Sequence, residues 1–206
     1  MYMFFNNYEL GILFSIGSWL ENDNVLVLRH KNKYFLEQIN KYYSYNIYKQ
    51  CVKDKNQYVL KIYNFNIQNL YKIGWNNRNS NIRDIPQLDC YKDFLRAYLE
   101  LHGCLDYSVR YRYRGKRDKY KALRLRVYGN YNIIYKLNYI ISCECSVNVK
   151  TVQGLGSSDN GKTSYLAYCD FVEIKNIYNY VFDYPYCEEY WDDVEGKMSK
   201  PVLFGE

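Results

Sequence analysis

The chain has 206 residues, of which 48% are hydrophobic and 24% are charged. These values exclude an intrinsically disordered protein and suffice for one large domain or two small ones with a hydrophobic core. The formal net charge of +6 is moderately basic, so the position of the charge along the chain matters more than its total.

Seven cysteines and two histidines show no metal-binding pattern, because no CxxC pair and no zinc-ligand spacing occur. We therefore expect reduced thiols in an intracellular, cytosol-like compartment, which for a viral protein is that of the host cell. The apolar N-terminal segment lacks a basic region and is interrupted by Asn6, Asn7 and Glu9. The sequence thus predicts neither a signal peptide nor contact with a membrane.

The predicted elements occur in two similar series. Residues 8–19 have helical apolar spacing, and strands at 25–30, 47–54 and 57–64 follow, with a helix at 33–43. Residues 91–105 repeat the helix. This helix is followed by strands at 107–114 and 122–129, a helix at 132–142, strands on both sides of 154–164 and a helix at 172–182. Gly17 and Gly103 lie 86 positions apart, which indicates one αββαββα unit present twice.

Residues 156–163 match the G-x-x-x-x-G-K-T pattern of a phosphate-binding loop. Such a loop must connect a buried parallel strand directly to a helix N-terminus. The preceding residues 145–153 do indicate a strand, but residues 164–168 indicate a second strand, with a helix only from about Phe171. A hairpin loop, which needs the same Gly, Ser, Asp and Asn, is therefore favoured over a nucleotide site.

Residues 107–128 carry more than the chain's entire net charge of +6, and Asp118 is the one acidic residue of this segment. The basic residues of this segment are Arg110, Arg112, Arg114, Lys116, Arg117, Lys119, Lys121, Arg124 and Arg126. Arginines alternate with apolar residues, which is typical of a hairpin with a core face and an outward face. Outward arginines can contact phosphates and guanine edges, whereas the alternative interpretation is a solvated charged face.

The layout and its residues resemble the single-chain, two-repeat LAGLIDADG homing endonucleases over roughly residues 8–195. LGILFSIGS (10–18) and FLRAYLELHG (94–103) stand at the two helical motifs. NLYKIGWNNRNSNIRDIP (69–86) is similar to the linking segment, and IYNYVFDYPYCEEYWDD (177–193) is similar to the closing helices.

The resemblance implies an α+β fold, a duplicated pseudo-symmetric αββαββα arrangement with two antiparallel saddle-shaped sheets that lie in the DNA major groove. The expected repeats are residues 1–88, whose first hairpin is short and weakly charged, and residues 89–206, which carry the basic hairpin. Small residues at the contact of the two motif helices would be Gly11, Gly17, Ala97 and Gly103. Because both repeats are in one chain, we expect a monomer.

The resemblance also implies one carboxylate at the end of each motif helix, where the pair holds Mg²⁺ for cleavage. The matching positions here are Ile16 and His102, so no metal or other cofactor is expected. His102 is then either a structural residue at the helix end or a phosphate contact. Glu9 and Glu100 cannot replace the missing carboxylates, because their positions on the helices place them away from Ile16 and His102. Glu21, Asp23 and Asp106 follow the helix ends and are the acids that could return to the site and bind Mg²⁺.

We therefore expect a catalytically inactive, homing-endonuclease-like protein that binds double-stranded DNA, such as a regulator from a phage or other mobile element. In this interpretation the nine basic residues and Lys162 contact nucleic acid. The alternatives are a protein-binding inhibitor of host nucleic-acid or defence machinery, a Mg²⁺-dependent endonuclease with displaced acids, and an intron-RNA-binding maturase.

Overall fold

The computed structural model describes residues 5–52, 55–77, 82–114, 116–155 and 163–204. The chain divides into two compact units, residues 1–101 and 102–206, which are described separately. This division follows the packing of the chain. The predicted repeat boundary between residues 88 and 89 concerns the sequence duplication and stays a prediction.

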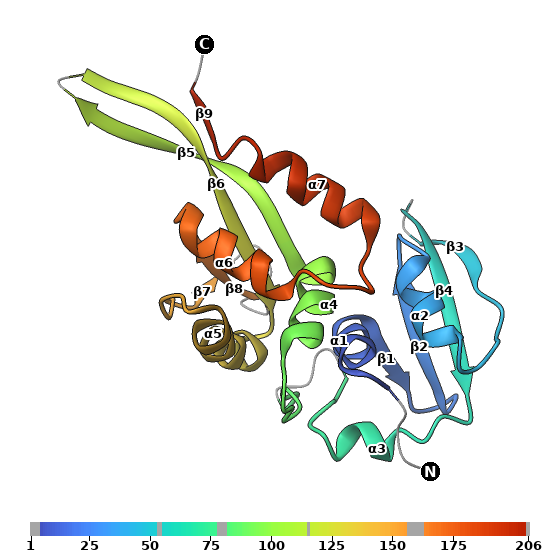
Figure 1. The fold of residues 1–206 in the computed structure, drawn as a ribbon. Coiled ribbons are helices and arrows are strands. Elements are labelled where there is room, and N and C mark those ends of the chain that lie inside the picture. Colours follow the sequence, from blue (N-terminus) through green and yellow to red (C-terminus); the bar gives the residue numbers. More distant parts are fainter. Residues whose placement is uncertain (1–4, 53–54, 78–81, 115, 156–162, 205–206) are drawn as a thin grey trace. The chain divides into compact units, whose positions relative to one another are not determined.

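Unit 1 contains an antiparallel sheet with helices against one face (Figure 1). In spatial order its strands are β1 (Gly17–Leu20), β2 (Val25–His30), β4 (Lys55–Tyr63) and β3 (Tyr48–Val52). The helices are α1 (Asn7–Ile16), α2 (Tyr34–Asn40), α3 (Gln68–Tyr71) and α4 (Lys92–His102), which belongs to this unit as far as Leu101. Leu26, Leu28, Leu60 and Ile62 alternate on the helix-covered face and are fully buried, which forms the core of the unit.

The start of α1 is fixed by a capping box. The Asn6 side chain accepts a hydrogen bond from the Glu9 backbone N–H at 2.9 Å, and the Glu9 carboxylate accepts one from the Asn6 N–H at 3.0 Å. Lys41 and Tyr42 bind the same buried carboxylate. The Glu9 carboxylate is therefore engaged in the first turn of the helix, whereas Ile16 is its last residue.

The end of α1 differs from the prediction, since the helix stops at Ile16 and not at residue 19. Gly17 has a φ of −71°, an extended conformation, so it does not act as a left-handed helix cap. Three donors converge on the Leu13 carbonyl oxygen: the Gly17 N–H, Trp75 Nε1 at 2.9 Å and Arg83 Nη2 at 3.3 Å. The buried Arg83 cation suits this position because the C-terminus of a helix carries partial negative charge.

The predicted small-residue contact of the two motif helices occurs at Gly11 and Ala97. A Cβ on Gly11 would lie 2.7 Å from both Ala97 Cβ and the Phe94 carbonyl oxygen, so the backbones of α1 and α4 approach closely there. At Gly17 the nearest atoms belong to Leu13 and Trp75 instead. Gly103 lies beyond α4, which ends at His102 rather than residue 105, and opens the next strand.

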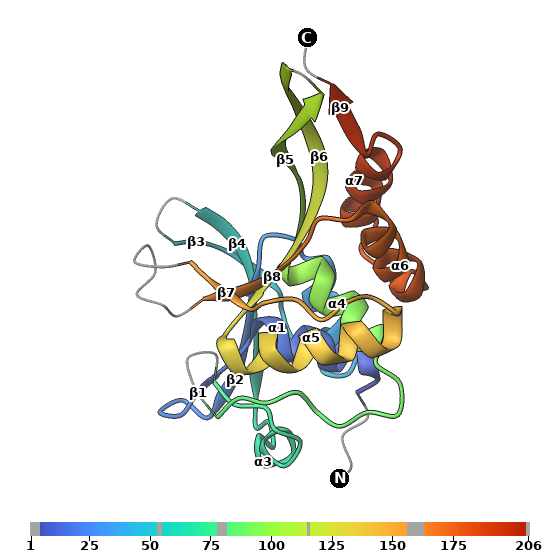
Figure 2. The ribbon, with the colours of Figure 1, turned by 90° about the vertical axis from the view of Figure 1, so that its left-hand side faces the viewer.

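Unit 2 repeats the strand order of unit 1 (Figures 1 and 2). Its strands in spatial order are β5 (Gly103–Arg114), β6 (Lys116–Gly129), β8 (Ser164–Tyr168) and β7 (Gln153–Gly154), and β9 (Val202–Phe204) also pairs with β6. The helices are α5 (Tyr131–Cys145), α6 (Phe171–Val181) and α7 (Glu188–Met198). The expected helices at 132–142 and 172–182 are confirmed as α5 and α6.

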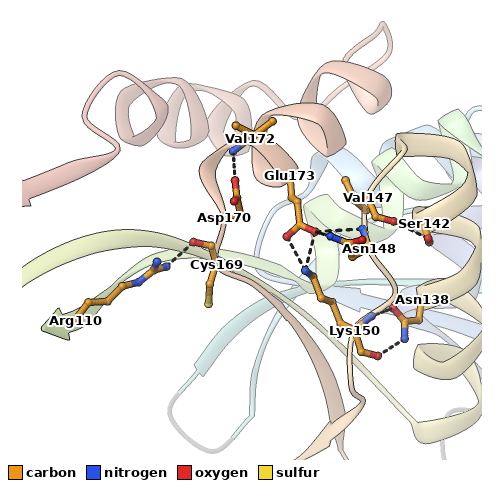
Figure 3. A network of polar contacts seen from close by, with 10 residues as sticks. All are labelled: Arg110, Asn138, Ser142, Val147, Asn148, Lys150, Cys169, Asp170, Val172 and Glu173. Atoms are coloured by element: carbon orange, nitrogen blue, oxygen red, sulfur yellow. Dashed lines mark hydrogen bonds and ion pairs between the residues drawn. The ribbon is translucent and has the colours of Figure 1, made fainter. Parts of the chain in front are cut away.

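The strand predicted at 145–153 is wrong except for its last residue. Residue 145 ends α5, and the segment that follows bonds to side chains of α5 and α6 instead of to a neighbouring strand (Figure 3). Asn138 binds both the N–H and the carbonyl of Lys150, at 2.9 and 2.5 Å, and Lys150 Nζ lies 2.6 Å from the Glu173 carboxylate. Because these side chains satisfy its backbone groups, the segment needs no ladder partner.

The two sheets have the orders β1-β2-β4-β3 and β5-β6-β8-β7, so the duplicated α+β arrangement is confirmed. β1 and β2 have four and six residues, whereas β5 and β6 have 12 and 14. No helix among the described residues is long and apolar enough to cross a membrane.

Candidate nucleic-acid interface

β5 and β6 form a long hairpin whose two faces carry different side chains. Antiparallel pairing places Asp106 opposite Arg124, Cys104 opposite Arg126 and Arg110 opposite Tyr120. Since side chains alternate along a strand, one set of arginines shares the face that points away from the helices. We call this set the arginine face; its described members are Arg110, Arg112, Arg124 and Arg126. Leu105, Leu123, Leu125 and Val127 lie on the other face and are buried.

The basic segment does not form one surface. Lys119 pairs with Tyr111 and Lys121 with Val109, which places both exposed lysines on the side opposite the arginine face. The side chains of Arg114, Lys116 and Arg117, and all of Lys162, lie outside the described residues. The structure thus brings four of the predicted binding residues together and separates two from them.

Arg110 and Arg112 lie toward the outer part of the hairpin. Arg110 Nη2 donates to the Cys169 carbonyl oxygen at 2.6 Å and the Leu123 carbonyl oxygen at 3.1 Å, so its guanidinium reaches across β6 (Figure 3). The Arg112 guanidinium lies over the Tyr120 ring, 5.4 Å from its centroid, which is a cation–π contact. Both side chains are therefore ordered on the sheet surface before any ligand binds.

The centre of the arginine face is organised by Asp106. Its Oδ1 accepts from Arg124 Nε at 3.0 Å, and its Oδ2 accepts from Arg124 Nη2 at 2.9 Å and Arg126 Nη2 at 2.5 Å. Burial raises the pKa of Asp106, but the hydrogen bonds and charges of Arg124 and Arg126 outweigh it and hold this pKa below its ordinary range. The three groups together carry one net positive charge and remain partly exposed, at 24–30% of their side-chain surface.

The same positions of unit 1 are apolar. Gly17 and Gly103 each open a first strand and pair with Leu28 and Val127. An equal number of residues from these pairs leads to corresponding positions in the two units. The pair of Leu20 and Val25 in unit 1 corresponds to the pair of Asp106 and Arg124 in unit 2. Val27 corresponds to Arg126. Val25 and Val27 are 1% and 0% exposed and pack with Val59 and Leu20. We call this cluster the valine face.

The ends of the two motif helices lack the oxygen ligands that a magnesium site requires. Ile16 is the last residue of α1 and His102 is the last residue of α4. An isoleucine side chain has no donor atom, and an imidazole is a poor ligand for a hard cation. Within the described part of the chain, no group of three or more His, Cys, Asp or Glu side chains is arranged to hold a metal. Ile16 and His102 themselves therefore do not fit Mg²⁺.

The acids considered as substitutes are placed elsewhere. Glu21 and Asp23 lie in the turn after β1, and β1 carries the chain away from Ile16 by roughly 3.3 Å per residue. Asp106 is bound by two arginines. The Glu100 carboxylate accepts a hydrogen bond from the Tyr8 hydroxyl of α1. In this structure both oxygens of Asp106 accept hydrogen bonds from Arg124 and Arg126, and the expectation that Asp106 could bind Mg²⁺ stays a prediction.

Comparisons with known proteins identify the fold. No protein-family model and no curated protein sequence matches the chain. Solved structures do match: each of the three below is a LAGLIDADG homing endonuclease or meganuclease with DNA bound, and the chain has their fold.

I-AabMI bound to uncleaved DNA matches with a TM-score of 0.60 and 12% identity over 95% of this chain and 90% of that one. I-LtrWI bound to its target DNA matches with a TM-score of 0.57 and 14% identity over 94% and 88%. I-SmaMI with uncleaved DNA and calcium ions matches with a TM-score of 0.56 and 9% identity over 93% and 89%. The likeness thus includes both units.

The sequence prediction overlooked Asp106 as the partner of the arginines. The basic segment defined by composition, residues 107–128, begins one residue after Asp106. The signal was present in the spacing, since Asp106 shares the parity of Arg110 and Arg112 along β5. Its contact with Arg124 became visible only once the hairpin register was known.

Proposed function

We propose that this chain binds duplex DNA through the arginine face of unit 2. The observation that carries the proposal is the concentration of Arg110, Arg112, Arg124 and Arg126 on one face of the β5–β6 hairpin, opposite the face that carries the buried leucines. The solved structures that share the fold have DNA bound, which gives such a surface an obvious ligand. Guanidinium groups suit this ligand because they form paired hydrogen bonds with phosphates and with guanine edges.

We further propose that the protein binds DNA without cutting it, as a regulator carried by a phage or other mobile element would. Ile16 and His102 at the ends of α1 and α4 supply no carboxylate. Metal-dependent hydrolysis of a phosphodiester needs a cation that polarises the phosphate and activates water. Losing both carboxylates would abolish that step rather than slow it.

The test is selection from a random duplex library at about 0.1 M salt with Mg²⁺, in which bound and broken DNA are both measured. We expect retained, intact DNA. Four to six phosphate contacts would give a log–log slope of affinity against salt of about −4 to −5. Retention that does not depend on salt, or strand breaks that depend on Mg²⁺, would contradict the proposal.

The second candidate is a protein-binding inhibitor, and exposed tyrosines in both units favour it. Tyr42, Tyr48 and Tyr63 of unit 1 are exposed, as are Tyr131 and Tyr184 of unit 2. Tyrosines are enriched where proteins bind one another. If the library selection retains no DNA at any salt concentration, a pull-down with the whole chain becomes the next experiment, and retention of a defined partner there would favour this candidate.

A further inference from the structure

Asp106 uses one edge of the Arg124 guanidinium and leaves another edge accessible. Nε and Nη2 of Arg124 donate to the two carboxylate oxygens, at 3.0 and 2.9 Å. A guanidinium is planar and has five N–H donors in a fixed fork. The donors that remain are those of Nη1 and the second hydrogen of Nη2, which together form the terminal edge of the group.

The orientation of Arg124 is therefore set by the protein before DNA arrives. Arg126 fixes the carboxylate from a second side, through Nη2 at 2.5 Å, and its own guanidinium lies 5.4 Å from the centre of the Tyr128 ring. The Arg124 side chain keeps 30% of its surface exposed, so a ligand can reach it. A side chain that is held in place loses less conformational entropy when it binds.

We propose that Asp106 is a specificity-determining residue, which orients the terminal edge of Arg124 toward the O6 and N7 atoms of a guanine in the major groove. This inference rests on the proposed function, since it concerns how the same surface distinguishes sequences. A freely rotating arginine would bind any nearby phosphate, whereas an arginine held by a carboxylate favours the planar, paired acceptors of guanine. The same negative charge lowers affinity for DNA of unrelated sequence.

The experiment compares wild-type protein with Asp106→Asn in parallel selections from a random duplex library, followed by salt titrations on unselected duplex. Asn keeps the shape of Asp but removes the charge. We expect wild type to enrich a motif with an invariant guanine, and we expect the variant to accept other bases there. On unselected duplex the variant should bind more tightly, with a slope steeper by about 1. Asp192→Asn, which removes an equal charge from the exposed surface of α7, should change neither.

Arg124→Lys provides a second variant that keeps the charge and loses the planar fork. It should lose the guanine preference while its salt slope stays that of wild type. An Asp106→Asn protein with an unchanged motif would overturn the inference, as would wild-type binding without any sequence preference; in both cases DNA binding itself would stand. A wild-type protein that retains no duplex would overturn the proposed function and this inference together.

Discussion

The two sheets share one strand order but present different side chains on the face away from their helices. In unit 2 that face carries Asp106, Arg124 and Arg126, and in unit 1 the corresponding positions are Leu20, Val25 and Val27. The arginine face is partly exposed, whereas the valine face is buried at its centre. The duplicated backbone has therefore kept its geometry while the chemistry of one face changed.

This difference shows which surface is available to an anion. Buried valines gain stability from the apolar surface they remove from water, and a phosphate would gain nothing there. Arginines held on a sheet by one carboxylate keep a net positive charge and spare donors. We infer that any DNA contact is concentrated in unit 2, so that binding should be unequal between the two halves of a target site.

The largest expected effect comes from placing a charge on the valine face. Val27→Arg would bury a guanidinium where no side chain of opposite charge corresponds to Asp106, because the matching residue is Leu20. An unpaired buried charge costs about 3–5 kcal/mol. Chemical denaturation should show a loss of that size in the free energy of unfolding.

Tyr48→Arg is the matched control. Tyr48 pairs with Val59 of the valine face, but its own side chain is 40% exposed. Its free energy of unfolding should change by less than about 0.5 kcal/mol. If both variants lose the same stability, the valine face is not buried in the way described.

The reverse exchange should affect binding and spare stability. The triple variant Asp106→Leu, Arg124→Val, Arg126→Val gives unit 2 the residues of unit 1. Replacing a partly buried ion cluster by apolar residues is often neutral or stabilising, so the free energy of unfolding should change by about 1 kcal/mol or less. Affinity for duplex DNA should fall about 100-fold, and the salt slope should become shallower by about 1, because the loss of the Asp106 charge offsets the loss of one arginine. Unchanged affinity would remove the centre of the arginine face from the interface.

The fold could be predicted from the sequence because its signals are local. The apolar run in 25–28, the alternating apolar residues in 122–129 and the helical spacing in 132–142 each identify an element without knowledge of its neighbours. The duplicated arrangement then follows from the two similar series of elements, whereas the strand order required the structure. The wrong strand prediction arose where the signal is not local. Residues 146–152 have strand-like composition, but their backbone groups bond to the side chains of Asn138, Ser142 and Glu173 instead of to a neighbouring strand.

The candidate site could be predicted only in part, for the same reason. Period-two spacing identifies which residues of one strand share a face, and this correctly placed Arg110 with Arg112. It separates Lys119 and Lys121 from Arg124 and Arg126 only once β6 is known to begin at Lys116 rather than residue 122. It does not give the register between strands, so the bonds of Asp106 required the structure. Ile16 and His102 were located by the motif alone, because each stands at a fixed distance from a glycine.

The two faces of the β5–β6 hairpin should contribute unequally to the affinity for DNA. Arg112→Ala removes a cation that shares the arginine face, and loss of one contact to a base costs about 1–3 kcal/mol, which is a loss of affinity of about 5- to 150-fold. Lys119→Ala removes the same charge from the opposite face. Its affinity should change by less than a factor of about 3 in titrations at identical salt concentration. Equal losses would mean that DNA surrounds the hairpin and that both faces bind.

The smallest expected effect is the pH dependence that Asp106 gives to stability. The pKa of this carboxyl is lower in the folded protein than in the unfolded chain, so the folded state is stabilised where Asp106 is ionised in both. The contribution is complete above the unfolded value of about 4 and is lost as the pH falls through the lower folded value. Because the group is partly exposed, this contribution to stability should be about 1 kcal/mol.

The difference in free energy of unfolding between wild type and Asp106→Asn should be constant from pH 7 to about 5 and shrink steadily below that. A difference that grows toward low pH would show that Arg124 and Arg126 do not stabilise the ionised carboxylate, and the contrast between the two faces would then lie in exposure rather than in pairing.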